Sequence, residues 1–145
     1  MLLPQQLVTR LVNTGLLGDE KDIVYCGTVD QVKNGKRKKR VLMVADAAIY
    51  TFVVDDRFAM LDERYAKLSK TLNSKSVEIV ECDEENKQVK FSATLAGGLR
   101  KTLTIELADK KEYKELSSSL EYLMELNNQK MKTKGSKGMR LRQNY

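Results

Sequence analysis

The stretch that decides the fold is VKNGKRKKRVLMVADAAIY, residues 32–50, in which a turn signal, five consecutive basic residues and an apolar run follow one another. Asn34-Gly35 favours a two-residue hairpin turn, because both central positions of a type I′ turn need a positive φ. The residues before this turn are rich in β-formers, so residues 23–33 and 36–45 are predicted to pair as antiparallel strands. The segment RVLMVA is apolar on both faces, which indicates a strand whose outer face is covered.

Further strands are predicted on both sides of an ambiguous segment. AIYTFVV, residues 48–54, follows a reversal at Asp46-Ala47, and three later segments alternate apolar and polar residues: SVEIVEC, KQVKFSATL and KTLTIEL. Between them, residues 55–72 carry apolar residues at helical spacing, yet YAKLSKTL within them also alternates as a half-buried strand does. Periodicity leaves helix and strand both open for this segment.

Two helices frame the strands. Asp109 with Glu112 three positions later predicts the start of a helix over about residues 109–127. Its apolar stripe consists of Tyr113, Leu116, Leu120, Leu123 and Met124. At the other end, Leu3, Leu7 and Leu11 predict a short amphipathic helix over residues 3–14 that packs on the domain or on a partner.

The length of 145 residues suits one compact domain with appendages. The expected organisation is an N-terminal helical extension over residues 1–18, one domain over residues 19–128 and a basic flexible tail over residues 129–145. No apolar run reaches membrane-spanning length and the start lacks a signal-peptide pattern, so a cytoplasmic protein is expected. In such a compartment Cys26 and Cys82 are expected to be small buried hydrophobes without a disulfide.

Positive charge is concentrated in two stretches that contain no acidic residue. These stretches hold twelve of the 26 basic residues, and the remaining 14 face 20 acidic residues elsewhere in the chain. Such a distribution favours polyanionic partners. The first stretch consists of Lys33, Lys36, Arg37, Lys38, Lys39 and Arg40, and the second of Lys130, Lys132, Lys134, Lys137, Arg140 and Arg142.

The order of six or seven antiparallel strands and a long helix resembles that of pleckstrin-homology-like (PH-like) domains. The segment KNGKRKKRVLMVADAAIYTF is similar to the tail-homology-1 region of class I myosins. This resemblance implies a mainly β fold with some α structure: a bent antiparallel β-barrel of about seven strands, capped by the C-terminal helix. It also implies binding of anionic phospholipids, typically phosphoinositides, through a basic hairpin, whose positions Lys33, Lys36, Lys39 and Arg40 match here.

We therefore expect a non-enzymatic adaptor or targeting module, peripheral to a membrane or the cytoskeleton. The six basic residues at 33–40 are its predicted lipid-binding set, with the six in the tail as a secondary contact. Because a tight Asn-Gly turn cannot wrap a headgroup, the hairpin is expected to form a flat electrostatic surface rather than a deep pocket.

Other functions stay open to different degrees. A protein-interaction module of a cytoskeletal or signalling assembly would use a strand edge or either helix. KRKKR matches a nuclear-import signal but runs directly into a strand, and the aromatic residues fall on core positions, which argues against nucleic-acid binding. No histidine, Cys-x-x-Cys motif or phosphate-binding glycine loop is present, and the acidic clusters lack calcium-loop spacing. We accordingly expect no catalytic residue, metal or cofactor.

Overall fold

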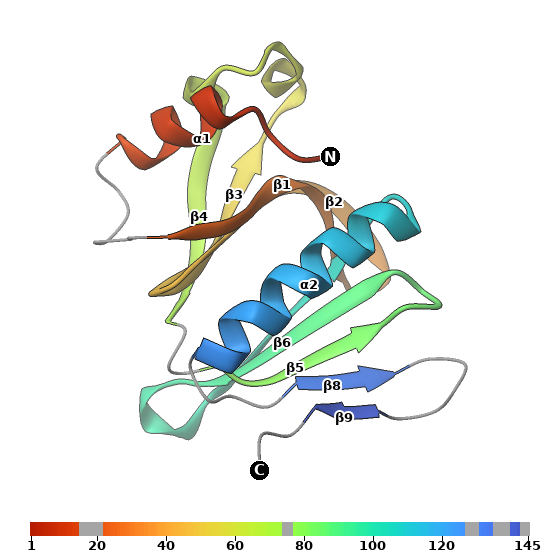
Figure 1. The fold of residues 1–145 in the computed structure, drawn as a ribbon. Helices are drawn as coiled ribbons and strands as arrows, with labels where there is room; N and C mark the ends of the chain where they lie inside the picture. Colours follow the sequence, from red (N-terminus) through yellow and green to blue (C-terminus); the bar gives the residue numbers. More distant parts are fainter. Residues whose placement is uncertain (15–21, 74–76, 127–130, 135–139, 143–145) are drawn as a thin grey trace.

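The computed structural model describes residues 1–14, 22–73, 77–126, 131–134 and 140–142. Within these residues a single sheet has the strand order β4-β3-β2-β1-β7-β6-β5-β8-β9. It bends strongly and does not close, so that two halves face each other across the core (Figure 1). The seven predicted antiparallel strands are β1 Ile23–Lys33, β2 Lys36–Ala45, β3 Ala48–Val54, β4 Ala66–Asn73, β5 Val77–Asp83, β6 Gln88–Thr94 and β7 Arg100–Glu106.

The predicted hairpin of β1 and β2 is confirmed. Lys33 pairs with Lys36 across the turn, where Asn34 and Gly35 both have positive φ, as a type I′ turn requires. The hairpin extends beyond the rest of its half of the sheet, because β3 pairs with β2 only from Val44 to Arg40. On its other side β1 pairs with β7 over three positions, Asp30–Val32. The end of the hairpin, at Lys36–Lys39, therefore has no β3 neighbour.

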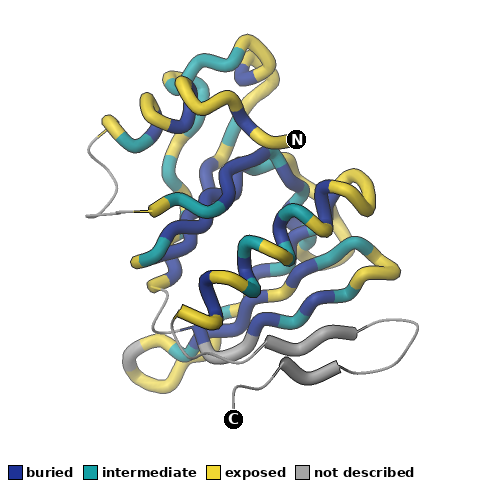
Figure 2. The backbone as a smooth tube through the Cα atoms, viewed as in Figure 1, coloured by how far each residue is buried: buried dark blue, intermediate teal, exposed yellow. Residues whose placement is uncertain are grey.

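Helix α2, Lys110–Leu126, packs against the concave side of the bent sheet (Figure 1). Its predicted cap is present, because the Asp109 carboxylate accepts a hydrogen bond from the Glu112 backbone N–H at 2.8 Å. The apolar stripe of α2 is buried as predicted, in a core that includes Leu42, Phe91 and Ile105 from the two halves of the sheet (Figure 2).

The outer face of β2 and β3 is covered by helix α1, Gln5–Val12. Leu7 and Leu11 are fully buried in a second apolar cluster with Val41, Met43 and Phe52. This explains why RVLMVA is apolar on both faces: Leu42 and Val44 belong to the main core, and Val41 and Met43 to the outer one. The packing expected of Leu3, Leu7 and Leu11 is confirmed. The predicted boundary at residue 18 lies outside the described residues.

The ambiguous segment contains both kinds of structure. Two short 3₁₀ turns, η1 Asp56–Met60 and η2 Glu63–Tyr65, come first, and the strand β4 follows from Ala66. The side chains of Asp55 and Asp62 start the two turns by accepting hydrogen bonds from the Arg57 and Arg64 backbone N–H groups. The first turn ends at Leu61, which has a left-handed backbone with φ of 57°, and the second ends at Ala66, where the backbone becomes extended.

Two short pieces of the expected flexible tail, residues 131–134 and 140–142, are described as strands. β8, Met131–Lys134, pairs in parallel with β5, and β9, Arg140–Arg142, pairs with β8. The edge of β5 offers unpaired backbone groups, and the register places Lys132 opposite Glu81 and Lys134 opposite Asp83. The pairing of β8 with β5 depends on residues far apart in sequence, whereas the prediction of a flexible tail rests on local composition.

Candidate functional site

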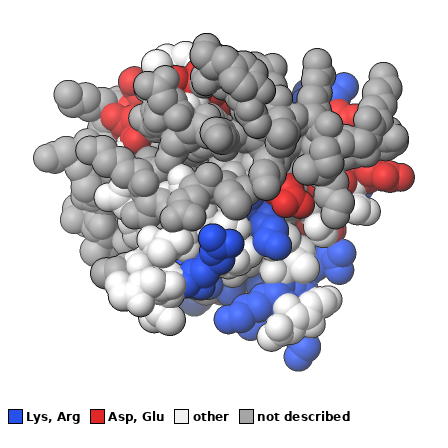
Figure 3. All heavy atoms as spheres, turned by 90° about the horizontal axis from the view of Figure 1, so that it is seen from below, with Lys and Arg blue, Asp and Glu red and all other residues white. Residues whose placement is uncertain are grey.

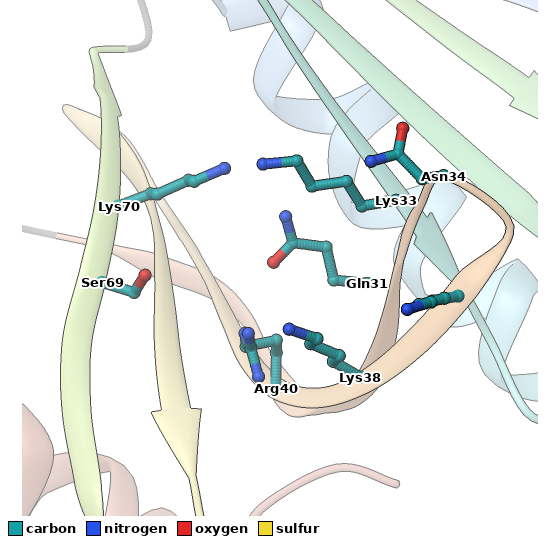
Figure 4. A pocket seen from close by; sticks show the side chains of 8 residues that line it. Gln31, Lys33, Asn34, Lys38, Arg40, Ser69 and Lys70 are labelled. Atoms are coloured by element: carbon teal, nitrogen blue, oxygen red, sulfur yellow. The ribbon is translucent and has the colours of Figure 1, made fainter.

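A cavity of about 400 Å³ lies between the β1–β2 hairpin and β4. Among the described residues that line it, five are basic and none is acidic (Figure 4). The sequence predicts a flat charged surface at this hairpin, whereas the structure has a hollow, because β4 stands opposite the hairpin and supplies a second wall. The lining residues are Gln31, Lys33, Asn34, Lys36, Lys38, Arg40, Ser69 and Lys70.

Strand alternation explains how these cations reach one side. On β2, Leu42 and Val44 face the main core, so Arg40, Lys38 and Lys36 continue the same row beyond the core. On β1 the row runs from Val29 through Gln31 to Lys33. The basic residues at the start of β2 are therefore compatible with a buried strand: the row is apolar where the core covers it and basic where it lines the cavity.

Lys33 and Lys70 extend toward one another from opposite walls of the cavity (Figure 4). Burial lowers the pKa of Lys70 from its ordinary value, and the nearby charges of Lys33, Lys101 and Arg40 lower it further. These effects mean that Lys70 lies in a positive potential that no carboxylate of the lining offsets. An anion placed between the two walls would relieve this repulsion.

Polar groups within and beneath the cavity have hydrogen-bonding capacity to spare. The Nε of Arg40 is buried without a hydrogen-bond partner, although its Nη1 donates to the Lys39 carbonyl at 2.9 Å. The hydroxyl of Thr51, which stands opposite Lys70 in the strand register, is also buried and unpartnered. Gln31 is only 9% exposed, and its amide points into the cavity (Figure 4). Buried donors without partners are costly to the fold. The Gln31 amide, which faces the cavity, is the group among these that favours a ligand with acceptor oxygens.

The other face of the hairpin carries the remaining two cations in a different setting. Arg37 forms a bidentate ion pair with Glu106 of β7, with distances of 2.8 and 2.9 Å. This pairing is the main cause that lowers the pKa of the Glu106 carboxyl. Lys39 stands opposite Asp30 in the register of β1 and β2 and lines a separate depression beside Met1 and Glu112. Arg37 and Lys39 therefore lie outside the basic cavity.

Sequence reasoning names four of the five basic lining residues and misses Lys70, together with Gln31 and Ser69. Lys70 would have been found if residues 66–73 had been interpreted as a strand, since it alternates with the buried Leu72. Lys132, Lys134, Arg140 and Arg142 lie on β8 and β9, at the far end of the strand order from β4, while Lys130 and Lys137 lie outside the described residues.

Neither a metal site nor a membrane-crossing helix emerges from the described ranges. No group of three potential metal-ligating side chains occurs there. None of the helices described combines the length and hydrophobicity that a membrane span requires. Cys26 and Cys82 are free and buried, as expected from the sequence, and burial raises the pKa of each thiol to about 12.

No family model and no curated protein matches this chain in sequence. Solved structures do match its fold. The hSac2 domain of the human phosphoinositide phosphatase Sac2 superposes with a TM-score of 0.60 at 12% identity, over 97% of this chain and 93% of that one.

Two further matches come from larger proteins. The DH/PH structure of PDZ-RhoGEF gives a TM-score of 0.57 at 11% identity over 71% of this chain, and a Vav1 structure gives 0.58 at 13% identity over 85%. The chain spans only 29% and 23% of these two chains, respectively. These structures support a PH-like fold, and none of the three is a myosin tail region. The chain accordingly has a PH-like fold: a bent, open antiparallel sheet with a C-terminal helix and a short N-terminal helix.

Proposed function

We propose that this chain is a non-enzymatic PH-like targeting module that binds the phosphorylated headgroup of an anionic phospholipid in the cavity between the β1–β2 hairpin and β4. The observation that carries the proposal is the convergence of five basic side chains, without an acidic one, on a cavity of about 400 Å³. The PH-like fold supports the broader class, lipid or protein binding. A phosphoinositide is the finer assignment.

The chemistry of the cavity supports a headgroup with more than one phosphate. Lys33 and Lys70 approach from opposite walls, and Lys38 and Arg40 lie between them (Figure 4). A single small anion would satisfy one wall, whereas phosphates at several positions of one ring can meet both. The amide of Gln31, which points into the cavity, supplies a directional donor in addition to charge.

The magnitude of the electrostatic contribution is sufficient for peripheral binding. Each basic residue near an anionic membrane is worth about 1 kcal/mol, so five could contribute about 5 kcal/mol before the cost of association. The module would then associate with a membrane reversibly and from one side. Sac2, whose hSac2 domain has a similar fold, is a phosphoinositide phosphatase, so a domain of this shape occurs in a protein that acts on this class of lipid.

The hairpin itself provides the matched variants for a test. Lys38→Gln with Arg40→Gln removes two charges from the cavity, and Arg37→Gln with Lys39→Gln removes two charges from the interleaved positions on the other face. Binding would be measured by co-sedimentation with phosphatidylcholine vesicles, alone or with phosphatidylserine or phosphatidylinositol bisphosphate. The cavity pair should lose about 10- to 30-fold in affinity for the phosphoinositide vesicles, as expected for two contacts of about 1 kcal/mol.

The control pair should lose much less, because it changes the long-range field without removing a cavity contact. Equal losses in the two pairs would mean that the hairpin acts as a flat charged surface, and the pocket assignment would fail. If the wild-type protein does not bind anionic vesicles, the lipid-binding function is excluded. The protein-interaction alternative would then be preferred, with β4, an edge strand of the described sheet, as the first surface to probe.

A further inference from the structure

The turn between β6 and β7 exposes two leucines. Leu99 is 70% exposed and Leu95 is 39% exposed, on either side of the short 3₁₀ turn η4, Ala96–Gly98. No other turn between strands presents two such residues in the described part of the chain. An exposed leucine by itself needs no explanation, but a pair on one turn beside a basic cavity does.

The pair continues apolar rows of the main core toward the cavity. On β6, Phe91 and Ala93 face the core and Leu95 follows two positions later. On β7, the core residue Leu103 is followed toward the turn by Lys101 and Leu99. β1 pairs antiparallel with β7 as far as Val32 and Thr104, so the cavity residues Lys33 and Asn34 come next on the side of β7 that leads to Leu99. The charge of Lys101, near the start of β7, also lowers the pKa of Lys70.

The face of the molecule on which the turn lies also carries basic side chains. The turn lies at the lower left of Figure 1, and Figure 3 views the molecule from below. On the described part of that face, Lys and Arg side chains gather next to a group of uncharged ones (Figure 3). Arg100, directly after Leu99, is also exposed, so basic residues border the two leucines.

The turn is held in place before any ligand arrives. Two backbone hydrogen bonds close it, from Leu95 N–H to the Leu99 carbonyl at 2.7 Å and from Gly98 N–H to the Leu95 carbonyl at 3.1 Å. Gly97 and Gly98 both have positive φ, which leucine or alanine would adopt only with strain. A turn whose backbone is already held loses little backbone conformational entropy when its side chains become buried.

We propose that Leu95 and Leu99 insert into the acyl-chain boundary of an anionic bilayer while the neighbouring basic cavity holds a headgroup of the same membrane. The proposal rests on the proposed function and extends it, because it makes the bilayer surface itself part of the ligand. A lipid surface is the partner that fits, because it presents anionic headgroups next to an apolar layer. The basic cavity can bind the headgroups, and the two leucines can contact the apolar layer.

The inference predicts a difference between a lipid in a bilayer and its free headgroup. Leu95→Ser with Leu99→Ser should weaken binding to phosphatidylcholine vesicles that contain phosphatidylinositol bisphosphate by about tenfold or more, because each leucine forfeits burial of its apolar surface. Affinity for soluble inositol trisphosphate should change less than about twofold, since the cavity is intact. Tyr122→Ser on α2, which is 55% exposed in the wild type, serves as the control and should bind vesicles normally.

A second readout reports insertion directly. The chain contains no tryptophan, so Leu99→Trp introduces a single reporter, with Tyr122→Trp as its control. Emission of the Leu99→Trp protein should shift to shorter wavelength on vesicle addition and be quenched by lipids with brominated acyl chains, and emission of the control should not.

Two outcomes would overturn the inference alone: vesicle binding of the double serine variant equal to that of wild type, or emission of Leu99→Trp that vesicles leave unchanged. Wild-type protein that binds neither phosphoinositide vesicles nor inositol trisphosphate would overturn the proposed function, and the inference with it. Binding of inositol trisphosphate without any vesicle binding would exclude both insertion and the lipid function, and would leave the cavity as a site for a soluble phosphorylated ligand.

Discussion

At the scale of single residues, neighbouring cations of one hairpin lie in different electrostatic settings. The guanidinium of Arg37 is neutralised by Glu106 in a bidentate pair, whereas Arg40 keeps a buried, unpartnered Nε beside a cavity without carboxylates. Three positions in sequence separate the two arginines, and alternation along β2 places them on opposite faces. The face of the strand, rather than the local charge density, decides which cations remain available for a ligand.

The Arg37–Glu106 pair predicts a pH-dependent contribution to stability. Hydrogen bonds from Arg37 and then Gln88 lower the pKa of Glu106 below its ordinary 4.5, so the carboxylate stabilises the folded state above about pH 4.5. That contribution is lost as the pH falls through the lowered pKa. We expect Glu106→Gln to reduce the free energy of unfolding by up to about 1 kcal/mol at neutral pH, as for other exposed pairs. The difference should disappear in acid.

Urea unfolding of wild type and Glu106→Gln at several pH values between neutral and acid would measure this difference. A difference that stays constant with pH would mean that Glu106 contributes through packing or through its neutral hydrogen bond with Gln88, and not through its charge.

The sequence identifies most basic residues of the candidate site, but it does not show which of them line the cavity. Lys33, Lys36, Lys38 and Arg40 are recognisable as a basic run, because charge density is a local property. The exclusion of Arg37 depends on Glu106, which is 69 residues away in sequence, and the inclusion of Lys70 depends on a fold that brings β4 opposite the hairpin. Both facts are long-range, and no pattern within one segment carries them.

At the scale of helices and strands, features set by local sequence are likewise predictable, and features set by long-range contacts are not. The hairpin turn, the strands from β5 to β7 and α2 follow from local signals and are confirmed. The two-sided apolar character of β2 correctly predicts a covered outer face but does not say that α1 provides the cover. The strands β8 and β9 depend on pairing with the edge of β5, and sequence composition alone indicated a tail without structure.

Helix α1 is predicted to contribute strongly to stability because it completes the outer core. Leu7 is fully buried against β2 and β3, so Leu7→Ala should lower the free energy of unfolding by about 2–5 kcal/mol, the usual cost of a cavity at a buried leucine. Gln6→Ala, at an exposed position of the same helix, should change it by less than about 0.5 kcal/mol. Chemical denaturation of the three proteins measures both effects. If wild type and Leu7→Ala unfold with the same free energy, α1 is an appendage and residues 1–18 are not needed for the fold.

Helix α2 is predicted to be indispensable. Leu120 is completely buried in the main core, and Leu120→Asp would place a carboxylate there without a partner, at a cost of several kcal/mol against a total stability of about 5–15 kcal/mol. The variant should fail to show a cooperative thermal transition by circular dichroism. Tyr122→Asp, two positions away on the exposed face, provides the control and should unfold cooperatively. A soluble, cooperatively folded Leu120→Asp protein would contradict the position of this helix in the core.

At the scale of the whole molecule, positive charge is separated into two regions by the sheet itself. The strand order begins with β4, whose Lys70 lines the cavity, and ends with β8 and β9, which carry basic residues of the second stretch. In the backbone register, Lys132 and Lys134 of β8 pair with Glu81 and Asp83 of β5. The cavity has no acidic lining residue. The same number of basic residues should therefore contribute differently to the affinity for an anionic surface in the two regions.

The last prediction compares two variants that each replace four basic residues by glutamine. One changes Lys36, Lys38, Arg40 and Lys70 in the cavity, and the other changes Lys132, Lys134, Arg140 and Arg142 on β8 and β9. Both should flatten the salt dependence of binding to anionic vesicles, because exposed charges are screened beyond about 10 Å at 0.1 M salt. The cavity variant should lose far more affinity at every salt concentration, since its side chains converge on one site.

Vesicle co-sedimentation at low and high salt, with both variants first shown to fold, measures this difference. Equal losses would mean that only net charge matters, and that the hollow beside the hairpin adds nothing to binding. A larger loss in the β8–β9 variant would move the principal anion contact to the C-terminal strands. We expect the cavity variant to lose more affinity than the β8–β9 variant. This result requires that the convergence of basic side chains on one site matters more than their number. Such convergence distinguishes a binding site from a basic stretch of sequence.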